Sequence, residues 1–303
     1  MGILINSETK VLVQGITGKE GAKATRAMLD YFTNVVGGVT PNKGGQAVEG
    51  KPVFNSVASA IINFSDQYGV DRNNLVSAIY VPPFAAKAAI LEAIASDIPL
   101  VSVIGERIPI QDTAYCLAAA KEKKIRIIGP SSLGFITPGV GRVGVVGGPL
   151  VNEIFQPGNI GIISRSGGMT NEVSWQMRQA GMGQSTAVHV GGDLLMGTTY
   201  ADLLRMFEKD DQTKAVVIFG EHGGSYEFEI VEAIKNEEYT KPLAIYIGGK
   251  FANVLPEGLN IGHAGAIVER GKGAVEKEKA LRAVGALIAD TYEELADLVK
   301  PFA

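Results

Sequence analysis

One histidine of this chain lies among very small residues, which is an unusual setting for an imidazole. His263 stands in GHAGAI, between glycines and alanines. Small neighbours make few contacts, so the ring either packs as an ordinary residue beside a glycine turn or must be approached by a reactant. A neutral imidazole is a good nucleophile near neutral pH because its unperturbed pKa is about 6.5. A phosphoryl group on it would need helix N-termini to receive the charge.

The chain has two other histidines, and a glutamate adjoins one of them. His189 lies in the valine-flanked run STAVHVGG and is typical of a buried structural residue. Glu221 and His222 end the apolar run KAVVIFGEH, where a carboxylate could orient an imidazole. Adjacent residues leave a strand in different directions, so both need not face one site. The three histidines lack the paired spacing of zinc ligands, and we expect no metal site.

A glycine turn near the start of the chain could bind phosphate. QGITGKEG places Gly15, Gly18 and Gly21 between an apolar run and a helical stretch, where backbone N–H groups can approach an anion. The spacing differs from that of the dinucleotide fingerprint. Lys43 stands about 20 residues on, where a nicotinamide enzyme would carry an acidic ribose partner. The turn therefore favours phosphate or nucleotide binding, the alternative being a plain turn with a solvated lysine.

A second anion-receptive turn is ISRSGGMTNE. Ser166 follows an apolar run and precedes a helical stretch. It is no serine nucleophile of the G-x-S-x-G type, because Ser164 stands where the first glycine would be required. Its hydroxyl could be an ordinary N-cap. The helix N-terminus that it opens could also bind phosphate.

The rest of the chain predicts the scaffold that would hold these turns. Short Val/Ile runs such as KVLVQG, NVVGGVTP and PLAIYIGGK alternate with longer helical stretches. This alternation is typical of a parallel sheet that helices cover on both faces. In such sheets ligands bind at the carboxyl ends of the strands, where the glycine turns fall.

The segment Gly129–Gly158 interrupts the pattern with glycine and proline, and we place the domain junction inside it. The pattern then resumes and continues through HAGAIV, which predicts another open parallel sheet. We therefore expect an α/β fold with two domains, residues 1–135 and 136–303.

Composition excludes several classes of protein. The chain has 303 residues, of which 46% are hydrophobic and 20% charged, so disorder is not expected. Its net charge is −4 and no Lys/Arg block stands out, which argues against nucleic acid as a partner. No apolar run reaches the roughly 20 residues of a membrane helix. The start resembles no signal peptide, and Cys116 is the single cysteine, so we expect a cytoplasmic protein, or a mitochondrial matrix protein if eukaryotic.

The motifs VQGITGKEG, VGGVTPNKGG, SRSG, GEHGGS and GHAGAI, in this order, resemble those of the α subunits of succinyl-CoA synthetases along nearly the whole chain. The resemblance implies a Rossmann-like CoA-binding domain followed by a flavodoxin-like ligase domain. It implies a tricarboxylic acid cycle reaction in which ATP or GTP, succinate and CoA give succinyl-CoA, the nucleoside diphosphate and phosphate. A β subunit with an ATP-grasp domain would bind the nucleotide and Mg²⁺, in a heterodimer or heterotetramer.

The resemblance also implies roles for individual residues. His263 matches the family histidine that is phosphorylated, on a mobile loop, and Glu221 matches the glutamate that holds it. The residues Ser166, Gly167 and Gly168 open the helix whose N-terminus faces the phosphohistidine. The implied CoA contacts are Thr17, Gly18, Lys19, Glu20, Lys43, Ile104, Gly105 and Glu106.

Two departures from the family pattern concern the acid. Asn171, a candidate substrate or interface residue, stands where succinate-using relatives have tyrosine. Residues 131–134 read SSLG in place of the usual Asn-Cys-Pro-Gly. SRSGGM followed by Asn-Glu is similar to ATP-citrate lyase and citryl-CoA synthetase, so citrate or malate is the alternative substrate.

Two other classes of function remain as alternatives. A nicotinamide-linked oxidoreductase would need the acidic ribose partner that the sequence lacks. A non-catalytic CoA-binding protein would not need Glu221 and His263, which are both present.

Overall fold

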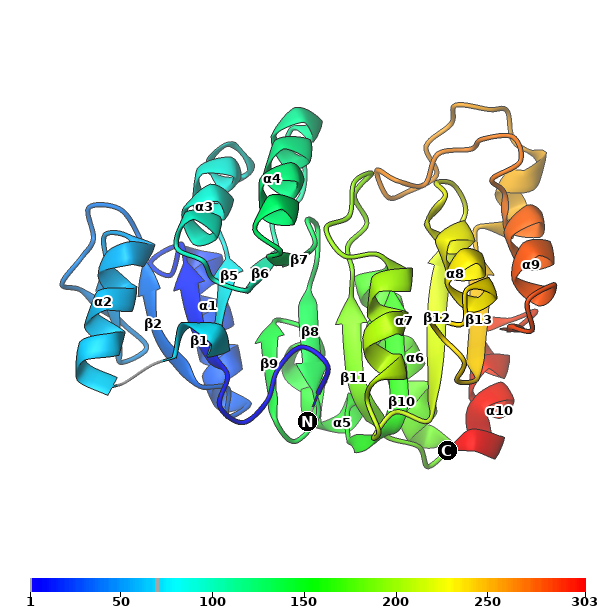
Figure 1. Ribbon diagram of the computed structural model, residues 1–303, viewed down its shortest axis with the longest axis horizontal. Helices are drawn as coiled ribbons and strands as arrows, with labels where there is room; N and C mark the ends of the chain where they lie inside the picture. Colours follow the sequence, from blue (N-terminus) through cyan, green and yellow to red (C-terminus); the bar gives the residue numbers. More distant parts are fainter. Residues whose placement is uncertain (1, 69–70) are drawn as a thin grey trace.

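Two seven-stranded sheets lie side by side in the computed structural model, which describes residues 2–68 and 71–303 (Figure 1). The first has the order β3-β4-β2-β1-β5-β6-β7, and its pairings are parallel except that of β3 with β4. Its strands are β1 (Lys10–Gln14), β2 (Val35–Val39), β3 (Ala47–Val48), β4 (Lys51–Phe54), β5 (Leu75–Ile79), β6 (Leu100–Val103) and β7 (Arg126–Ile128).

The second sheet has the order β14-β13-β12-β10-β11-β8-β9. Its strands are β8 (Gly134–Thr137), β9 (Gly141–Gly144), β10 (Pro157–Ser164), β11 (Gln184–His189), β12 (Ala215–Glu221), β13 (Leu243–Gly248) and β14 (Leu287–Ile288). The strands from β10 to β14 pair in parallel, whereas β8 runs antiparallel to both β11 and β9.

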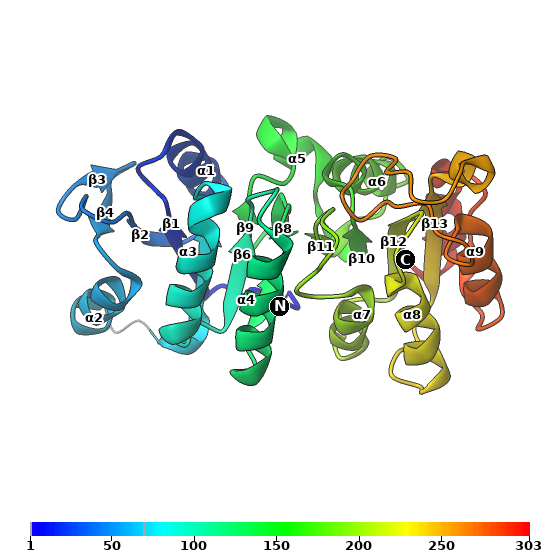
Figure 2. The same cartoon turned by 90° about the horizontal axis from the view of Figure 1, so that it is seen from above.

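The helices cover both faces of each sheet (Figure 2). On the first sheet, α1 (Lys19–Asp30) packs on one face, and α2 (Val57–Tyr68), α3 (Pro83–Ala95) and α4 (Ile110–Glu122) pack on the other. On the second, α6 (Gly167–Gln179) and α10 (Leu295–Val299) cover one face. The opposite face is covered by α7 (Tyr200–Glu208), α8 (Tyr226–Lys235) and α9 (Ala274–Arg282).

Strand alternation explains why continuous apolar runs form these strands. Ile162 belongs to the buried cluster that contains Val173 of α6, whereas the next residue, Ile163, belongs to the cluster that contains Leu203 of α7. Successive side chains of a strand point to opposite faces, so both faces of β10 need apolar residues. The predicted α/β fold with parallel-dominated sheets is thereby confirmed.

Two segments differ from the sequence pattern: one contains strands that were not predicted, and the other lacks a strand that was predicted. The Gly/Pro-rich segment after β7 forms the antiparallel hairpin β8–β9, in which Gly134 lies opposite Gly144. Both glycines have positive φ, 94° and 110°, and a side chain on either would overlap the carbonyl of the facing strand. The run HAGAIV is a loop and not a strand, and its only described pairing is a single bridge between Asn260 and Ile267.

The predicted domain boundary between residues 135 and 136 stays a prediction. The last strand of the first sheet ends at Ile128, and the second sheet begins with Gly134. Among the described residues, no helix is long and apolar enough to cross a membrane.

Candidate functional site

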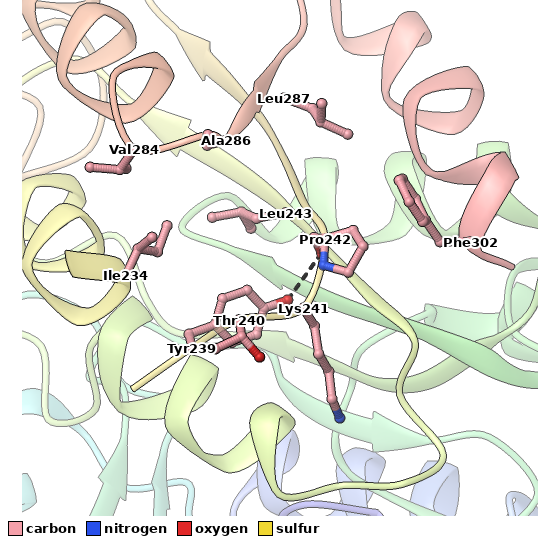
Figure 3. Close-up of a pocket in the computed structure, with 11 residues that line it drawn as sticks. Ile234, Tyr239, Thr240, Lys241, Pro242, Leu243, Val284, Ala286, Leu287 and Phe302 are labelled. Carbon is pink, nitrogen blue, oxygen red and sulfur yellow. Dashed lines mark hydrogen bonds between the residues drawn. The ribbon is translucent and has the colours of Figure 1, made fainter. Parts of the chain in front are cut away.

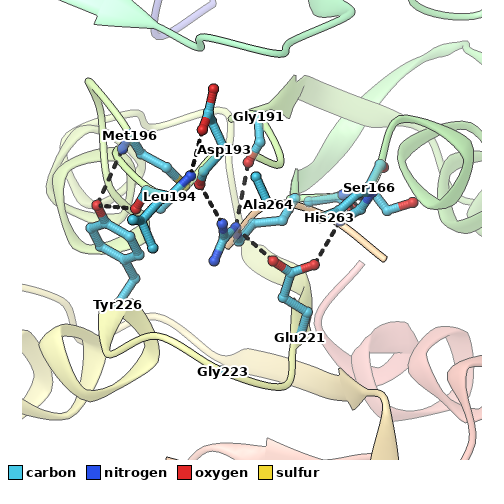
Figure 4. Close-up of polar contacts among 12 residues, drawn as sticks. Ser166, Gly191, Asp193, Leu194, Met196, Glu221, Gly223, Tyr226, His263 and Ala264 are labelled. Atoms are coloured by element: carbon cyan, nitrogen blue, oxygen red, sulfur yellow. Dashed lines mark hydrogen bonds and ion pairs between the residues drawn. The ribbon is translucent and has the colours of Figure 1, made fainter. Parts of the chain in front are cut away.

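The predicted catalytic pair, Glu221 and His263, is in direct contact (Figure 4). Glu221 is the last residue of β12, and His263 lies in the loop between the 3₁₀ segment Lys250–Val254 and α9. Nδ1 of His263 lies 2.7 Å from Oε2 of Glu221. An ionised carboxylate can only accept a hydrogen bond, so we assign Nδ1 as the protonated nitrogen, which leaves the lone pair on Nε2. This arrangement suits an imidazole nucleophile.

The carboxylate also changes the proton affinity of the ring. The hydrogen bond that His263 donates to Glu221 raises the pKa of His263 above its ordinary value, while burial and the charge of Arg165 act in the opposite direction. The His263 side chain is 41% exposed, whereas that of Glu221 is 11% exposed. A reactant can therefore reach the ring while the carboxylate behind it stays sheltered.

Arg165, which the sequence analysis did not select, completes this cluster. It follows the last residue of β10, and its side chain is 1% exposed. Its Nε lies 3.0 Å from Oε1 of Glu221, and its Nη2 donates to the carbonyl of Asp193 at 2.6 Å. The sequence contained one signal, because Arg165 stands inside the SRSG motif, between Ser164 and Ser166.

The glycines around His263 permit close packing. A Cβ on Gly192 would lie 2.9 Å from Cγ of His263, and a side chain on Gly265 would overlap the guanidinium of Arg165. Gly265 also donates its N–H to the carbonyl of Gly192 at 3.2 Å. Small residues therefore let the loop lie directly on the segments that follow β10 and β11. The expectation that the loop is mobile stays untested.

The N-terminus of α6 begins beside this cluster, since Ser166 directly follows Arg165. Ser166 caps α6 by accepting a hydrogen bond from the N–H of Met169 at 3.4 Å. Gly168 has no other group within 4 Å of the position its Cβ would take. Gly167 packs against Leu133 and His189. The N-cap role of Ser166 is therefore confirmed, and phosphate binding at this helix start stays a prediction.

His189 has the structural role that its valine-rich setting predicts. Its Nδ1 accepts the N–H of Leu133 at 2.7 Å, so Nε2 carries the proton and donates to the carbonyl of Arg165 at 2.9 Å. Burial lowers the pKa of His189 to about 4. The neutral ring thus joins the backbone of Leu133, the residue before β8, to the backbone of Arg165.

His222 does not join His263. It is 2% exposed, and neither ring nitrogen has a hydrogen-bond partner among the described residues. It lines a cavity of about 440 Å³ with Asn253, Gly273 and Glu276. Burial lowers the pKa of His222. Glu221 and His222 thus serve different environments, as their adjacency on a strand predicts.

A buried ion pair, also missed by the sequence analysis, holds the backbone of Glu221. Nζ of Lys277 donates to the carbonyl of Glu221 at 2.8 Å and to Oε2 of Glu227 at 2.6 Å. Oε1 of Glu227 accepts the N–H of Glu221 at 3.2 Å. Because both the N–H and the carbonyl of Glu221 are hydrogen-bonded, the backbone position from which its carboxylate extends is fixed.

The predicted CoA-binding residues follow three strands of the first sheet, at the edge where parallel strands end together. Gly18, Lys19 and Glu20 follow β1 and are exposed. Lys43 is exposed in the loop that follows β2, and a further stretch follows β6. The remaining members of the set are Thr17, which is half-buried beside Thr40, the half-buried Ile104 and Gly105, and the exposed Glu106.

Backbone hydrogen bonds connect this edge to the histidine. Ser131 donates its N–H to the carbonyl of Gly105 at 2.8 Å. The carbonyl of Ser131 in turn accepts the N–H of Gly192, the residue that packs against His263, at 3.3 Å. Figure 1 shows that strands of both sheets, such as β2 and β12, point to the same side of the molecule, which is the upper side in that view. The predicted CoA stretch and the catalytic pair therefore lie along one continuous edge.

Asn171 and a second cavity have no described contact with the Glu221–His263 pair. Asn171 uses its side-chain oxygen to accept the N–H of Gly147 at 2.9 Å. A cavity of about 280 Å³ lies at the amino end of β13 and is lined by Tyr239, Pro242 and Leu243 (Figure 3). Glu221 pairs with the opposite end of the same strand, so this cavity is remote from the catalytic pair.

Comparisons with known proteins agree with this layout. Residues 6–107 match the family described as CoA binding domain, and residues 157–302 match the succinyl-CoA ligase like flavodoxin domain. The chain is 44% identical over 301 residues to an ADP-forming succinate–CoA ligase subunit alpha 2 of Archaeoglobus fulgidus, covering 99% of each chain. It is 45% identical over 297 residues to the corresponding alpha subunit of Staphylococcus aureus, covering 97% of this chain and 93% of that one.

Two solved structures are similar over most of the chain. An ATP citrate lyase from Methanothrix soehngenii, in complex with citrate and coenzyme A, shares 26% identity with a TM-score of 0.88, over 99% of this chain and 50% of that one. A dinucleotide forming acetyl-coenzyme A synthetase from Ca. Korarchaeum cryptofilum is similar in fold, with 20% identity and a TM-score of 0.72, over 95% of this chain and 59% of that one. The chain thus spans only part of each of these two longer proteins.

Proposed function

This chain belongs to the family of succinate–CoA ligase alpha subunits, and we propose that it is the catalytic alpha subunit of a ligase that works through a phosphohistidine at His263. The reaction is succinate plus CoA plus ATP or GTP, giving succinyl-CoA, the nucleoside diphosphate and phosphate. The observation that carries the proposal is the 2.7 Å contact between Nδ1 of His263 and Oε2 of Glu221.

The contact supports a three-step sequence. Nε2 of His263 attacks the γ-phosphorus, and the nucleoside diphosphate leaves. A carboxylate oxygen of the acid then takes the phosphoryl group from Nε2, which gives an acyl phosphate and restores the neutral ring. The CoA thiolate attacks the acyl carbon and displaces phosphate. Each step depends on positioning and on stabilising charge as it develops.

The chain's own groups supply that positioning. Glu221 holds the Nδ1 proton and stabilises the positive ring of the phosphohistidine. The helix N-terminus at Ser166, Gly167 and Gly168 offers N–H groups to the phosphoryl oxygens, worth on the order of 1 kcal/mol. For CoA we assign the turn at Thr17, Gly18, Lys19 and Glu20, together with Lys43, Ile104, Gly105 and Glu106. The cations of Lys19 and Lys43 suit CoA phosphates.

The nucleotide and its Mg²⁺ belong, in this proposal, to a partner β subunit with an ATP-grasp domain, in a heterodimer or heterotetramer of the cytoplasm. The relatives are named as one subunit of their enzymes, which supports a partner. Within residues 2–68 and 71–303, no group of three His, Cys, Asp or Glu residues could hold a metal ion.

Citrate is the second candidate acid. The similarity in fold to a citrate lyase with bound citrate and the SRSGGM sequence favour it. Asn171, in α6, stands where the family resemblance expects tyrosine in succinate-using relatives, and its side-chain oxygen accepts the N–H of Gly147. Overall length and identity to the alpha subunits favour succinate.

Labelling tests both the mechanism and the acid. The chain is assembled with its cognate β subunit and given γ-labelled ATP or GTP with Mg²⁺. We expect acid-labile label on His263, and a chase with CoA plus succinate, but not CoA plus citrate, should discharge it. Label that only citrate discharges would change the substrate. No label with either nucleotide would contradict the phosphohistidine mechanism.

A further inference from the structure

We propose that Arg165 is a positioning residue for phosphoryl transfer: it fixes the carboxylate of Glu221 and forms the surface on which the His263 loop docks. The inference rests on the proposed function, because it assigns a role within the phosphohistidine step. The contacts described for Arg165 are with Glu221, Tyr226 and the loop after β11 and not with the His263 ring, so Arg165 acts through its neighbours.

The Arg165 guanidinium contacts residues from two strand ends, the segment after β11 and the last residue of β12. Its Nε contacts Oε1 of Glu221 at 3.0 Å and the carbonyl of Gly191 at 3.4 Å, and its Nη2 donates to the carbonyl of Asp193 at 2.6 Å. Arg165 itself follows β10, Glu221 ends β12, and Gly191 and Asp193 follow β11. The Nε–H donates to Gly191, so its contact with Oε1 of Glu221 is an ion pair and not a hydrogen bond. A planar guanidinium can hold these divergent partners in fixed geometry, whereas an ammonium group is a compact point charge.

The loop that carries His263 packs directly on the same guanidinium. A side chain on Gly265 would overlap Arg165 and would lie 2.9 Å from the carbonyl of Asp193. Gly265 has no positive φ that would itself require glycine, so steric contact with Arg165 explains the residue. Because Gly265 is two residues from His263, we expect a shift of the guanidinium to displace the loop that carries the ring.

Aromatic packing holds Arg165 from the other side. Its Cζ lies 5.7 Å from the centre of the Tyr226 ring. The hydroxyl of Tyr226 donates to the carbonyl of Leu194 at 3.3 Å and accepts the N–H of Met196 at 3.1 Å, which closes the loop after β11 (Figure 4). Arg165 is thus held between α8 and this loop, as a positioning group requires.

The charge of Arg165 has a separate effect on the ring. The titratable and charged groups around His263 are Glu221 from β12, Arg165 after β10 and the neutral His189 from β11. Glu221 raises the pKa of His263, and Arg165 opposes that rise. Only the neutral ring is a nucleophile. Loss of the guanidinium charge should therefore move the acid limb of the labelling rate to higher pH.

The test measures the rate of His263 labelling against pH in the assembled complex with γ-labelled nucleotide. For Arg165→Gln we expect labelling slower by about 10²-fold, the effect of a displacement of about 1 Å, and an acid limb at higher pH. For Arg165→Lys we expect an intermediate rate with an acid limb near that of the wild type. Arg142→Lys is the matched control, because Arg142 is also buried and binds backbone carbonyls but lies away from His263, and it should label at the wild-type rate.

A second variant keeps the inference testable if Arg165→Gln does not fold. Gly265→Ala leaves the arginine intact and should lift the loop, so labelling should slow. Wild-type rates and an unchanged pH profile in both Arg165→Gln and Gly265→Ala would overturn the inference, as would an equal loss in Arg142→Lys. Failure of the wild-type complex to label would instead overturn the proposed function.

Discussion

Glu227 and Lys277 form an ion pair with no solvent exposure, with Nζ 2.6 Å from Oε2, directly behind the backbone of Glu221. Lys277 comes from α9 and Glu227 from α8, so the pair joins two helices to the end of β12. Burial lowers the pKa of Lys277 and the nearby carboxylate opposes this effect. The backbone of Glu221, the proposed partner of the phosphohistidine, is therefore held by two buried charges that stabilise each other.

Removing one member of this pair should destabilise the fold strongly. Lys277→Met would leave the carboxylate of Glu227 buried without a cation, at a cost of about 3–5 kcal/mol in the free energy of unfolding. Urea unfolding monitored by circular dichroism measures this. The double variant Glu227→Leu/Lys277→Met should recover part of the loss, because no charge is then left alone. A Lys277→Met variant as stable as the wild type would contradict the role of the pair.

The Glu221–His263 contact predicts a defined pH response. Labelling of His263 should fall as the pH is lowered through a pKa above 6.5, since the protonated ring has no lone pair. Glu221→Gln removes the main cause of the raised pKa, so the acid limb should move to lower pH. The rate at neutral pH should fall by on the order of 10²-fold, because the ring loses its orienting charge. Initial labelling rates between pH 5 and 9 test both; an unmoved acid limb would contradict the assignment.

The sequence predicted the parts of the site that local patterns encode. Glu221 at the end of an apolar run and His263 among small residues were both selected, and the structure brings them together. Arg165 was missed because its contacts lie with Glu221 and Asp193, far along the chain, and nothing in its neighbours reveals them. Lys277 was missed for the same reason, since a lysine in a helix is normally solvated.

The same distinction between local patterns and long-range contacts explains which strands of the fold were predictable. Parallel strands were predictable because burial on both faces demands continuous Val/Ile runs. The hairpin β8–β9 was not, because its strands are short and glycine-rich, and its pairing depends on Gly134 meeting Gly144. The run HAGAIV has the apolar character of a strand but forms a loop. This loop packs near the carboxyl ends of β10 and β12, where Gly265 must fit against Arg165.

His189 should make the protein sensitive to acid. Its pKa is about 4 in the folded chain, against about 6.5 when unfolded, so the unfolded state binds the extra proton. Stability should therefore decrease as the pH falls from about 6.5 to 4, by up to about 3 kcal/mol. Free energies of unfolding in urea at several pH values measure the slope. His189→Gln, which cannot titrate, should show a shallower slope; an unchanged slope would assign the acid sensitivity elsewhere.

His222 should tolerate an apolar replacement, although it adjoins Glu221. Both of its ring nitrogens lack partners among the described residues, and a buried polar group without a partner contributes no net stability. His222→Leu should therefore keep the melting temperature at neutral pH or raise it, and should label His263 at the wild-type rate. Scanning calorimetry and the labelling assay check this. A large loss of either would mean that the imidazole makes a contact needed for folding or transfer.

Gly192 should be required for activity because of its contact with the ring and not because of its backbone. A Cβ there would lie 2.9 Å from Cγ of His263, closer than packed atoms allow, so the ring or its loop must move. Gly192→Ala should slow labelling by about 10²-fold, as expected for a displacement of about 1 Å, with little change in melting temperature. Gly141→Ala is the control, since its Cβ would meet no atom closer than 3.5 Å and the residue lies in β9, on the far edge of the sheet. If both variants label like the wild type, the ring has room to adjust, and tight packing against Gly192 does not set its position.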